Sequence, residues 1–130
     1  MQWLEDPAPD LVDAMLAQVR QLVARQLVTG YLERAGLRIL DHGWKCSDGV
    51  IDVVATEGPA LVVCQVTDRR CRRLHPRRPL ARASARKLRR LGVRWLAAKG
   101  GLFDELRVDL VTLTPESAGG FAVEHVRGAA

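Results

Sequence analysis

The chain is poor in several residue types that mark particular classes of protein. Its three cysteines are odd in number and lack a Cys-x-x-Cys spacing, which argues against a disulfide framework or a zinc site and favours a reducing compartment. No apolar run approaches the roughly 20 residues that cross a bilayer, and the first ten residues lack the apolar core of an export signal. These absences predict a cytoplasmic globular protein that does not contact a membrane.

Acidic residues are missing from one long stretch. No Asp or Glu occurs from Arg69 to Phe103, whereas twelve of the twenty Lys and Arg residues lie between Arg69 and Arg94. Solubilising surfaces usually mix both signs, so we interpret this stretch as a surface for a polyanion, with an arginine-rich solvated face as the alternative. The guanidinium fork suits phosphate oxygens. The candidate nucleic-acid-binding residues are Arg69, Arg70, Arg72, Arg73, Arg77, Arg78, Arg82, Arg86, Arg89 and Arg90.

Helical and strand patterns alternate along the rest of the chain. After a flexible tail of residues 1–9, a single domain is expected over 10–130, with a mixed β-sheet in the order α-β-β-β-α-β-β flanked by helices. Helices are expected from Asp10 to near Gly36 and over 80–99, and strands over 37–41, 50–56, 61–67, 107–114 and 121–126. The first helix carries one apolar stripe, formed by Val12, Met15, Leu16, Val19, Leu22, Val23, Leu27, Tyr31 and Leu32.

The second and third predicted strands carry the candidate site. The second strand contains Asp52, and the third places Gln65 and Thr67 on one face because side chains alternate along a strand. An acid on one strand opposite a residue-x-residue pair on the next is the layout of a magnesium-dependent nuclease site.

Several segments, in this order and spacing, resemble the YraN-type family, an uncharacterised bacterial group with a restriction-endonuclease-like, PD-(D/E)XK fold. They are YLERAGLRIL (31–40), Trp44-Lys45, GVID (49–52), LVVCQVTDR (61–69), Trp95-Leu96, RVDLV (107–111) and HVRGA (125–129). The family usually has glutamate at the positions of Arg25, Val50 and Gln65. It usually has lysine at the positions of Thr67 and Ser84.

These departures predict a degenerate active site. Magnesium needs several oxygen anions, and Asp52 alone supplies one, so no cofactor and no intact catalytic residue are expected. The resemblance then implies a nuclease-like protein that binds nucleic acid, preferably DNA, by backbone contacts and is accessory to DNA processing. Two alternatives stay open. One is an active Mg²⁺-dependent endonuclease with a site rebuilt from Asp48, Asp52 and Asp109; without such a site, Asp48 is a turn former and Asp109 the partner of a nearby arginine. The other is a protein-interaction module whose basic surface meets an acidic partner and whose apolar first helix packs in a homodimer.

Overall fold

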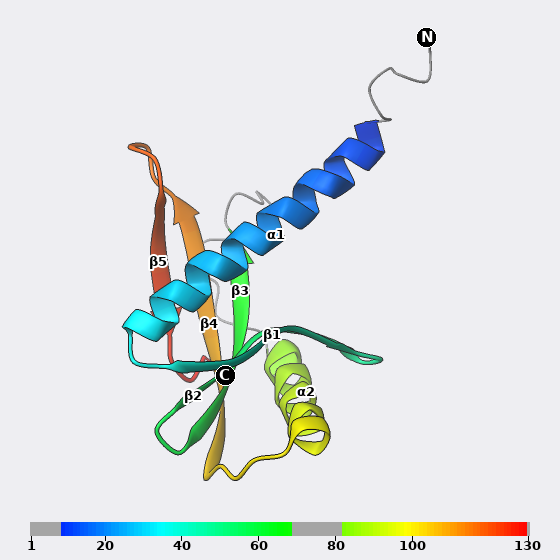
Figure 1. Cartoon of the computed structure of the whole chain (residues 1–130), viewed down its shortest axis with the longest axis vertical. Coiled ribbons are helices and arrows are strands. Elements are labelled where there is room, and N and C mark those ends of the chain that lie inside the picture. The colour runs from blue at the N-terminus through cyan, green and yellow to red at the C-terminus, as the bar shows by residue number, and fades with distance from the viewer. Residues whose placement is uncertain (1–8, 69–81, 130) are drawn as a thin grey trace.

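The computed structural model describes residues 9–68 and 82–129, which form two helices and one five-stranded sheet. The elements follow the predicted order (Figure 1). The predicted tail, apart from Pro9, and the predicted helix start at residue 80 lie outside the described residues. The elements are α1 (Pro9–Arg34), β1 (Arg38–Cys46), β2 (Gly49–Glu57), β3 (Ala60–Asp68), α2 (Arg82–Lys99), β4 (Glu105–Pro115) and β5 (Phe121–Val126).

The sheet is mixed, as the sequence predicts. Its strands lie in the order β1-β2-β3-β4-β5, and every neighbouring pair is antiparallel except β3 and β4, which α2 joins as a parallel crossover. The central strand β3 is buried on both faces: Val62 and Cys64 pack in the cluster with α1, whereas Leu61 and Val63 pack in the cluster with α2. The two helices therefore cover opposite faces of the sheet.

Only the C-terminal half of α1 packs on the sheet. Ala24, Val28 and Leu32, spaced four residues apart, are its buried row, and Gly36 ends the helix with a positive φ of 97°. The predicted apolar stripe is therefore not the packing face, apart from Tyr31 and Leu32. Figure 1 shows the N-terminal half of α1 extending past the sheet, so no layer formed by residues 9–68 and 82–129 covers the apolar side chains of that half.

The strand β1 is longer than predicted. We expected a strand over 37–41 followed by a connection over 42–48, but pairing with β2 continues to Cys46. The register shifts between Ile39 and Asp41. Ile39 packs against the α1 cluster and Trp44 against the α2 cluster. The irregularity moves the inward side chains from one face to the other and so breaks the alternation by which a strand is recognised.

The helix α2 lies close against the sheet. Its predicted inward residues Leu88, Leu91 and Trp95 are buried, and the Trp95 indole N–H donates to Asp41 Oδ2 at 2.9 Å. A Cβ atom at Gly92 would lie 2.7 Å from Leu106 Cδ1, so this glycine permits the close approach. No helix within residues 9–68 and 82–129 is long and apolar enough to cross a bilayer.

Candidate functional site

Asp52 lies where β2 separates from β3. The register between the two strands begins at Val53 and Cys64, and beyond that pair the Val66 backbone N–H donates to Asp52 Oδ2 at 2.8 Å. The carboxylate thus takes the place of a strand partner for this N–H group. Burial raises the pKa of Asp52 above its ordinary value, against the opposing effects of the Val66 hydrogen bond and the positive charge of Arg25.

Arg25 is the charged group of α1 that acts on Asp52. Its guanidinium lies over Gly43 of β1, where a Cβ atom would be 2.7 Å from Arg25 Nη1. Gly43 also has a positive φ of 60°, so any other residue there would be strained, and its Cβ atom would displace the flexible end of Arg25. The family that the sequence resembles usually has a glutamate at position 25. This chain has an arginine there instead, which sets a positive charge near Asp52.

The structure does not join the other two predicted site positions to Asp52. Gln65 and Thr67 are half-buried. Their neighbours Cys64 and Val66 pack in the α1 cluster, so the strand directs Gln65 and Thr67 to the face covered by α2. No hydrogen bond links either side chain to Asp52 in the part of the chain that the structure describes.

Asp48 and Asp109, the acids of the alternative rebuilt site, have other partners. Asp48 lies in the turn between β1 and β2, where Arg94 Nη1 is 2.8 Å and Arg90 Nε 3.8 Å from its Oδ2. The hydrogen bond and charge of Arg94 hold the pKa of Asp48 below its usual value. Across the described ranges, no three His, Cys, Asp or Glu side chains are grouped so that they could hold a metal ion.

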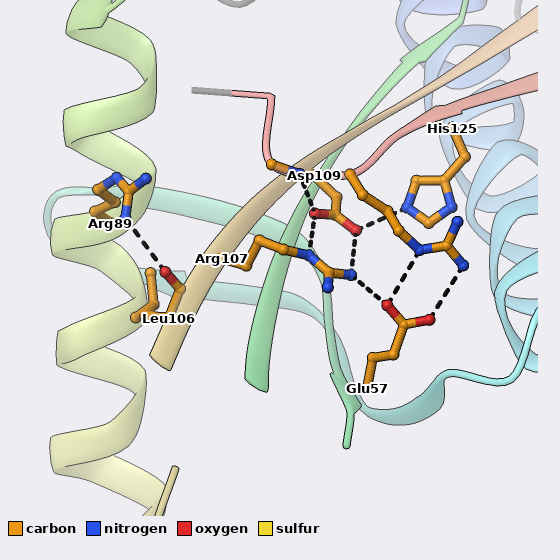
Figure 2. Close-up of polar contacts among 8 residues, drawn as sticks. Glu57, Arg89, Leu106, Arg107, Asp109 and His125 are labelled. Atoms are coloured by element: carbon orange, nitrogen blue, oxygen red, sulfur yellow. Dashed lines mark hydrogen bonds and ion pairs between the residues drawn. The ribbon is translucent and has the colours of Figure 1, made fainter. Parts of the chain in front are cut away.

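Asp109 is fully buried in a charged network that joins β2, β4 and the C-terminal segment. Arg107 donates from Nε to Asp109 Oδ1 at 2.8 Å and from Nη2 to Oδ2 at 2.9 Å. The same Nη2 donates to Glu57 Oε1 at 2.8 Å, and Arg127 binds both oxygens of Glu57 at 3.1 Å. Figure 2 shows the side chains of Glu57, Arg107 and Asp109 pointing toward one another. The predicted pairing of Asp109 with an arginine is confirmed, but the roles of Glu57 and Arg127 were not predicted.

His125 completes the network from β5. Its Nε2 lies 2.7 Å from Asp109 Oδ2, and its ring meets Tyr31 of α1 edge-on at 5.8 Å. Burial raises the pKa of Asp109, but the hydrogen bonds from Arg107, the Gly128 N–H and His125 outweigh it and hold the pKa below its usual value. Because an ionised carboxylate only accepts hydrogen bonds, His125 carries a proton on Nε2. The network links β2, β4, β5 and the C-terminal segment, and His125 Nδ1 is a buried nitrogen without a hydrogen-bond partner among the described residues.

The outward side of α2 is strongly basic. Asp48 pairs with two of its arginines, and Arg89 donates to the Leu106 carbonyl at 3.2 Å. Of the ten predicted nucleic-acid-binding arginines, six between residues 69 and 78 lie outside the described residues. Arg82 begins α2, and its side chain is not described. We define the basic face of α2 by five of its exposed cationic side chains, which lie on one side of the helix: Arg86, Lys87, Arg89, Arg90 and Arg94.

The sheet topology and the two covering helices place the chain in a structural class, a mixed α/β domain consistent with a restriction-endonuclease-like fold. Residues 24–113 match the Uncharacterised protein family UPF0102, and the chain belongs to this YraN-type family. It is 41% identical to a UPF0102 protein of Streptomyces coelicolor over 112 residues, covering 84% of this chain and 82% of that protein. It is 38% identical to UPF0102 proteins of Beutenbergia cavernae over 99 residues (75% and 84%) and of an Arthrobacter strain over 104 residues (79% and 88%).

Proposed function

We propose that this protein binds the phosphate backbone of nucleic acid through the basic face of α2 and does not cleave it. The observation that carries the proposal is the charge of that face. The face has five exposed cations, and among the described residues Asp48 is the carboxylate that pairs with two of them, Arg90 and Arg94. The face therefore keeps a net of four positive charges, which favours a polyanion.

The dimensions of the face suit a backbone. From Arg86 to Arg94 the helix rises about 12 Å at roughly 1.5 Å per residue. Duplex DNA presents about one phosphate charge per 1.7 Å of axis, so roughly seven phosphate charges lie within that length. Aromatic residues are few, at 5% of the chain. Contacts from this face would accordingly be electrostatic and independent of base sequence.

The surroundings of Asp52 support binding without cleavage. A hydrolytic metal needs several oxygen ligands to activate water and to neutralise charge on the phosphate. Asp52 already accepts a backbone hydrogen bond, and Arg25 supplies a positive charge beside it. A divalent cation at this position would gain one carboxylate and be repelled by the guanidinium.

A salt titration of DNA binding tests the proposal. Each neutralised phosphate contributes about −0.9 to the slope of log K against log salt, so four net charges give about −3.6, or a loss of roughly 150-fold between 50 and 200 mM salt. The double variant Arg86→Gln/Lys87→Gln should reduce the slope by about 1.8. Arg34→Gln, an exposed arginine at the end of α1, serves as the matched control and should leave the slope unchanged.

Two results would overturn the proposal. A salt-independent affinity, or equal losses from the α2 double variant and the control, would show that the basic face of α2 is not the binding surface. Cleavage of the DNA in Mg²⁺ or Mn²⁺ that disappears in Asp52→Asn would instead establish the metal-dependent nuclease.

A further inference from the structure

The helix α1 displays a large apolar surface between Leu11 and Leu27. Seven of its apolar side chains are exposed by at least 39%, and together they present on the order of 600 Å², the upper end of what monomeric proteins expose in one patch. We call this surface the outer face of α1. Its residues are Leu11 53%, Met15 55%, Leu16 47%, Val19 56%, Leu22 58%, Val23 39% and Leu27 39% exposed.

The outer face lies on the side of α1 that points away from the sheet. Successive residues turn by about 100° around a helix with 3.6 residues per turn, so Leu22 lies nearly opposite Ala24, which begins the buried row. Leu11 precedes Leu22 by three turns and lies on the same side. The outer face is therefore not a loosely packed part of the core. It is a second apolar stripe, centred on a different side of α1 from the buried row.

We propose that the outer face of α1 is a dimer interface that packs against the same face of a second copy of this chain, with the two helices antiparallel. Charge complementarity favours a second copy. Asp13 and Arg20 are both exposed and lie seven residues apart, which places them on one flank of the stripe. In an antiparallel two-fold pair, each Asp13 faces Arg20 of the partner copy, so the interface gains two ion pairs.

The same alignment brings apolar side chains into register. When residue 13 lies opposite residue 20 of the partner copy, Met15 approaches Val19 of the partner copy, and Val12 approaches its Leu22. These residues occur at three- and four-residue steps, the spacing by which two helices interdigitate. In a parallel two-fold pair, the flank of one helix that carries Asp13 and Arg20 lies on the opposite side of the pair from the same flank of its partner copy, so neither ion pair could form. The charge pattern therefore selects the antiparallel arrangement.

Charge exchange across the interface tests the proposal. The full chain, treated with nuclease and held in high salt so that nucleic acid cannot link two copies, should show twice the 14.4 kDa chain mass by sedimentation equilibrium. Asp13→Arg and Arg20→Asp should each weaken the dimer roughly tenfold, the effect of turning exposed ion pairs into repulsions. The double variant Asp13→Arg/Arg20→Asp should restore the wild-type dissociation constant, because the pairs re-form with their charges exchanged.

Two controls separate association from folding. Glu33→Arg reverses an exposed charge on the packed half of α1 and should leave the dissociation constant unchanged. Leu22→Glu should give a monomer with an unchanged circular dichroism spectrum, because Leu22 is 58% exposed. A wild-type monomer at every concentration, which would assign the outer face to another segment of the chain or to a different protein, overturns the proposal. A double charge exchange that weakens the dimer further also overturns it.

This inference is independent of the proposed nucleic-acid binding, because α1 and α2 lie on opposite faces of the sheet. Loss of dimerisation by Leu22→Glu tests the outer face of α1 alone. Loss of salt-dependent DNA binding by the α2 double variant tests the basic face of α2 alone. The failure of either proposal can therefore be told from the failure of the other.

Discussion

Two substitutions of Asp52 separate its backbone role from a metal-binding role. Asp52 Oδ2 accepts the Val66 N–H at 2.8 Å. An asparagine can accept the same hydrogen bond through its amide oxygen, whereas alanine leaves the N–H without an acceptor. Because this group is half-buried, we expect Asp52→Ala to lower the free energy of unfolding by about 1–2 kcal/mol. The melting temperature should fall by about 3–8 °C, and Asp52→Asn should avoid most of that loss.

The pH dependence of the Asp52→Asn variant has a defined sign. Burial raises the pKa of Asp52 in the folded protein, so the folded state holds its proton more tightly than the unfolded state does. The stabilisation from this carboxyl group is therefore fully present when the pH is below its unfolded-state pKa of about 3.9. It is lost as the pH rises through the raised pKa of the folded state. Asparagine does not ionise. The free energy of unfolding of Asp52→Asn, relative to that of the wild-type protein, should therefore be more favourable at pH 8 than at pH 4.

Urea unfolding, followed by circular dichroism at pH 4 and pH 8, measures both effects. The reasoning is refuted if Asp52→Asn is as destabilised as Asp52→Ala at both pH values. It is also refuted if Mg²⁺ raises the melting temperature of the wild-type protein but not that of Asp52→Asn, since that result would make the carboxylate a metal ligand.

Two further predictions concern packing and the buried network. Gly30→Ala should stabilise the protein by up to about 1 kcal/mol, because a Cβ there meets only the end of the flexible Arg34 side chain at 3.3 Å. Gly92→Ala should destabilise the protein by about 0.5–2 kcal/mol, because overpacking against Leu106 exceeds the gain in helix propensity. Changes in melting temperature that have the same sign for Gly30→Ala and Gly92→Ala would contradict this prediction. Asp109→Asn should cost about 2–4 kcal/mol at pH 7, because it leaves the Arg107 guanidinium without its main partner. The pKa of Asp109 is lowered. The difference in free energy of unfolding between the wild-type protein and Asp109→Asn, measured by urea titration, should therefore be constant above about pH 5 and shrink below about pH 4. A difference that grows in acid would contradict this prediction.

Local sequence signals predicted those helices and strands in which the buried residues recur at one constant spacing along the element. Gly36 marked the end of α1, and the mostly apolar segment over 61–67 marked the third strand, β3. The strand β1 was cut short in the prediction because the irregularity between Ile39 and Asp41 transfers its inward side chains to the other face. The packing face of α1 was missed for a related reason. Ala24 and Val28 form a weaker pattern than the bulkier residues of the outer face, and tertiary packing decides which pattern is buried.

The charged groups depend on contacts that lie far apart in the sequence. The pairing of Asp109 was predicted because Arg107 is two residues away, but Glu57 and Arg127 are 70 residues apart. The placement of Arg25 over Gly43 likewise required the three-dimensional arrangement. A glycine between His42 and Trp44 was the one local signal that a side chain from elsewhere needs space there.

The most direct test of the central claim combines binding and cleavage in one measurement. Labelled DNA is incubated with the full chain at low salt in Mg²⁺ or Mn²⁺, the bound fraction is isolated, and the length of the recovered strands is determined. We predict that wild-type protein retains the DNA uncut and that Arg86→Gln/Lys87→Gln retains much less of it. Recovery of shortened strands with wild-type protein, but not with Asp52→Asn, would contradict the account.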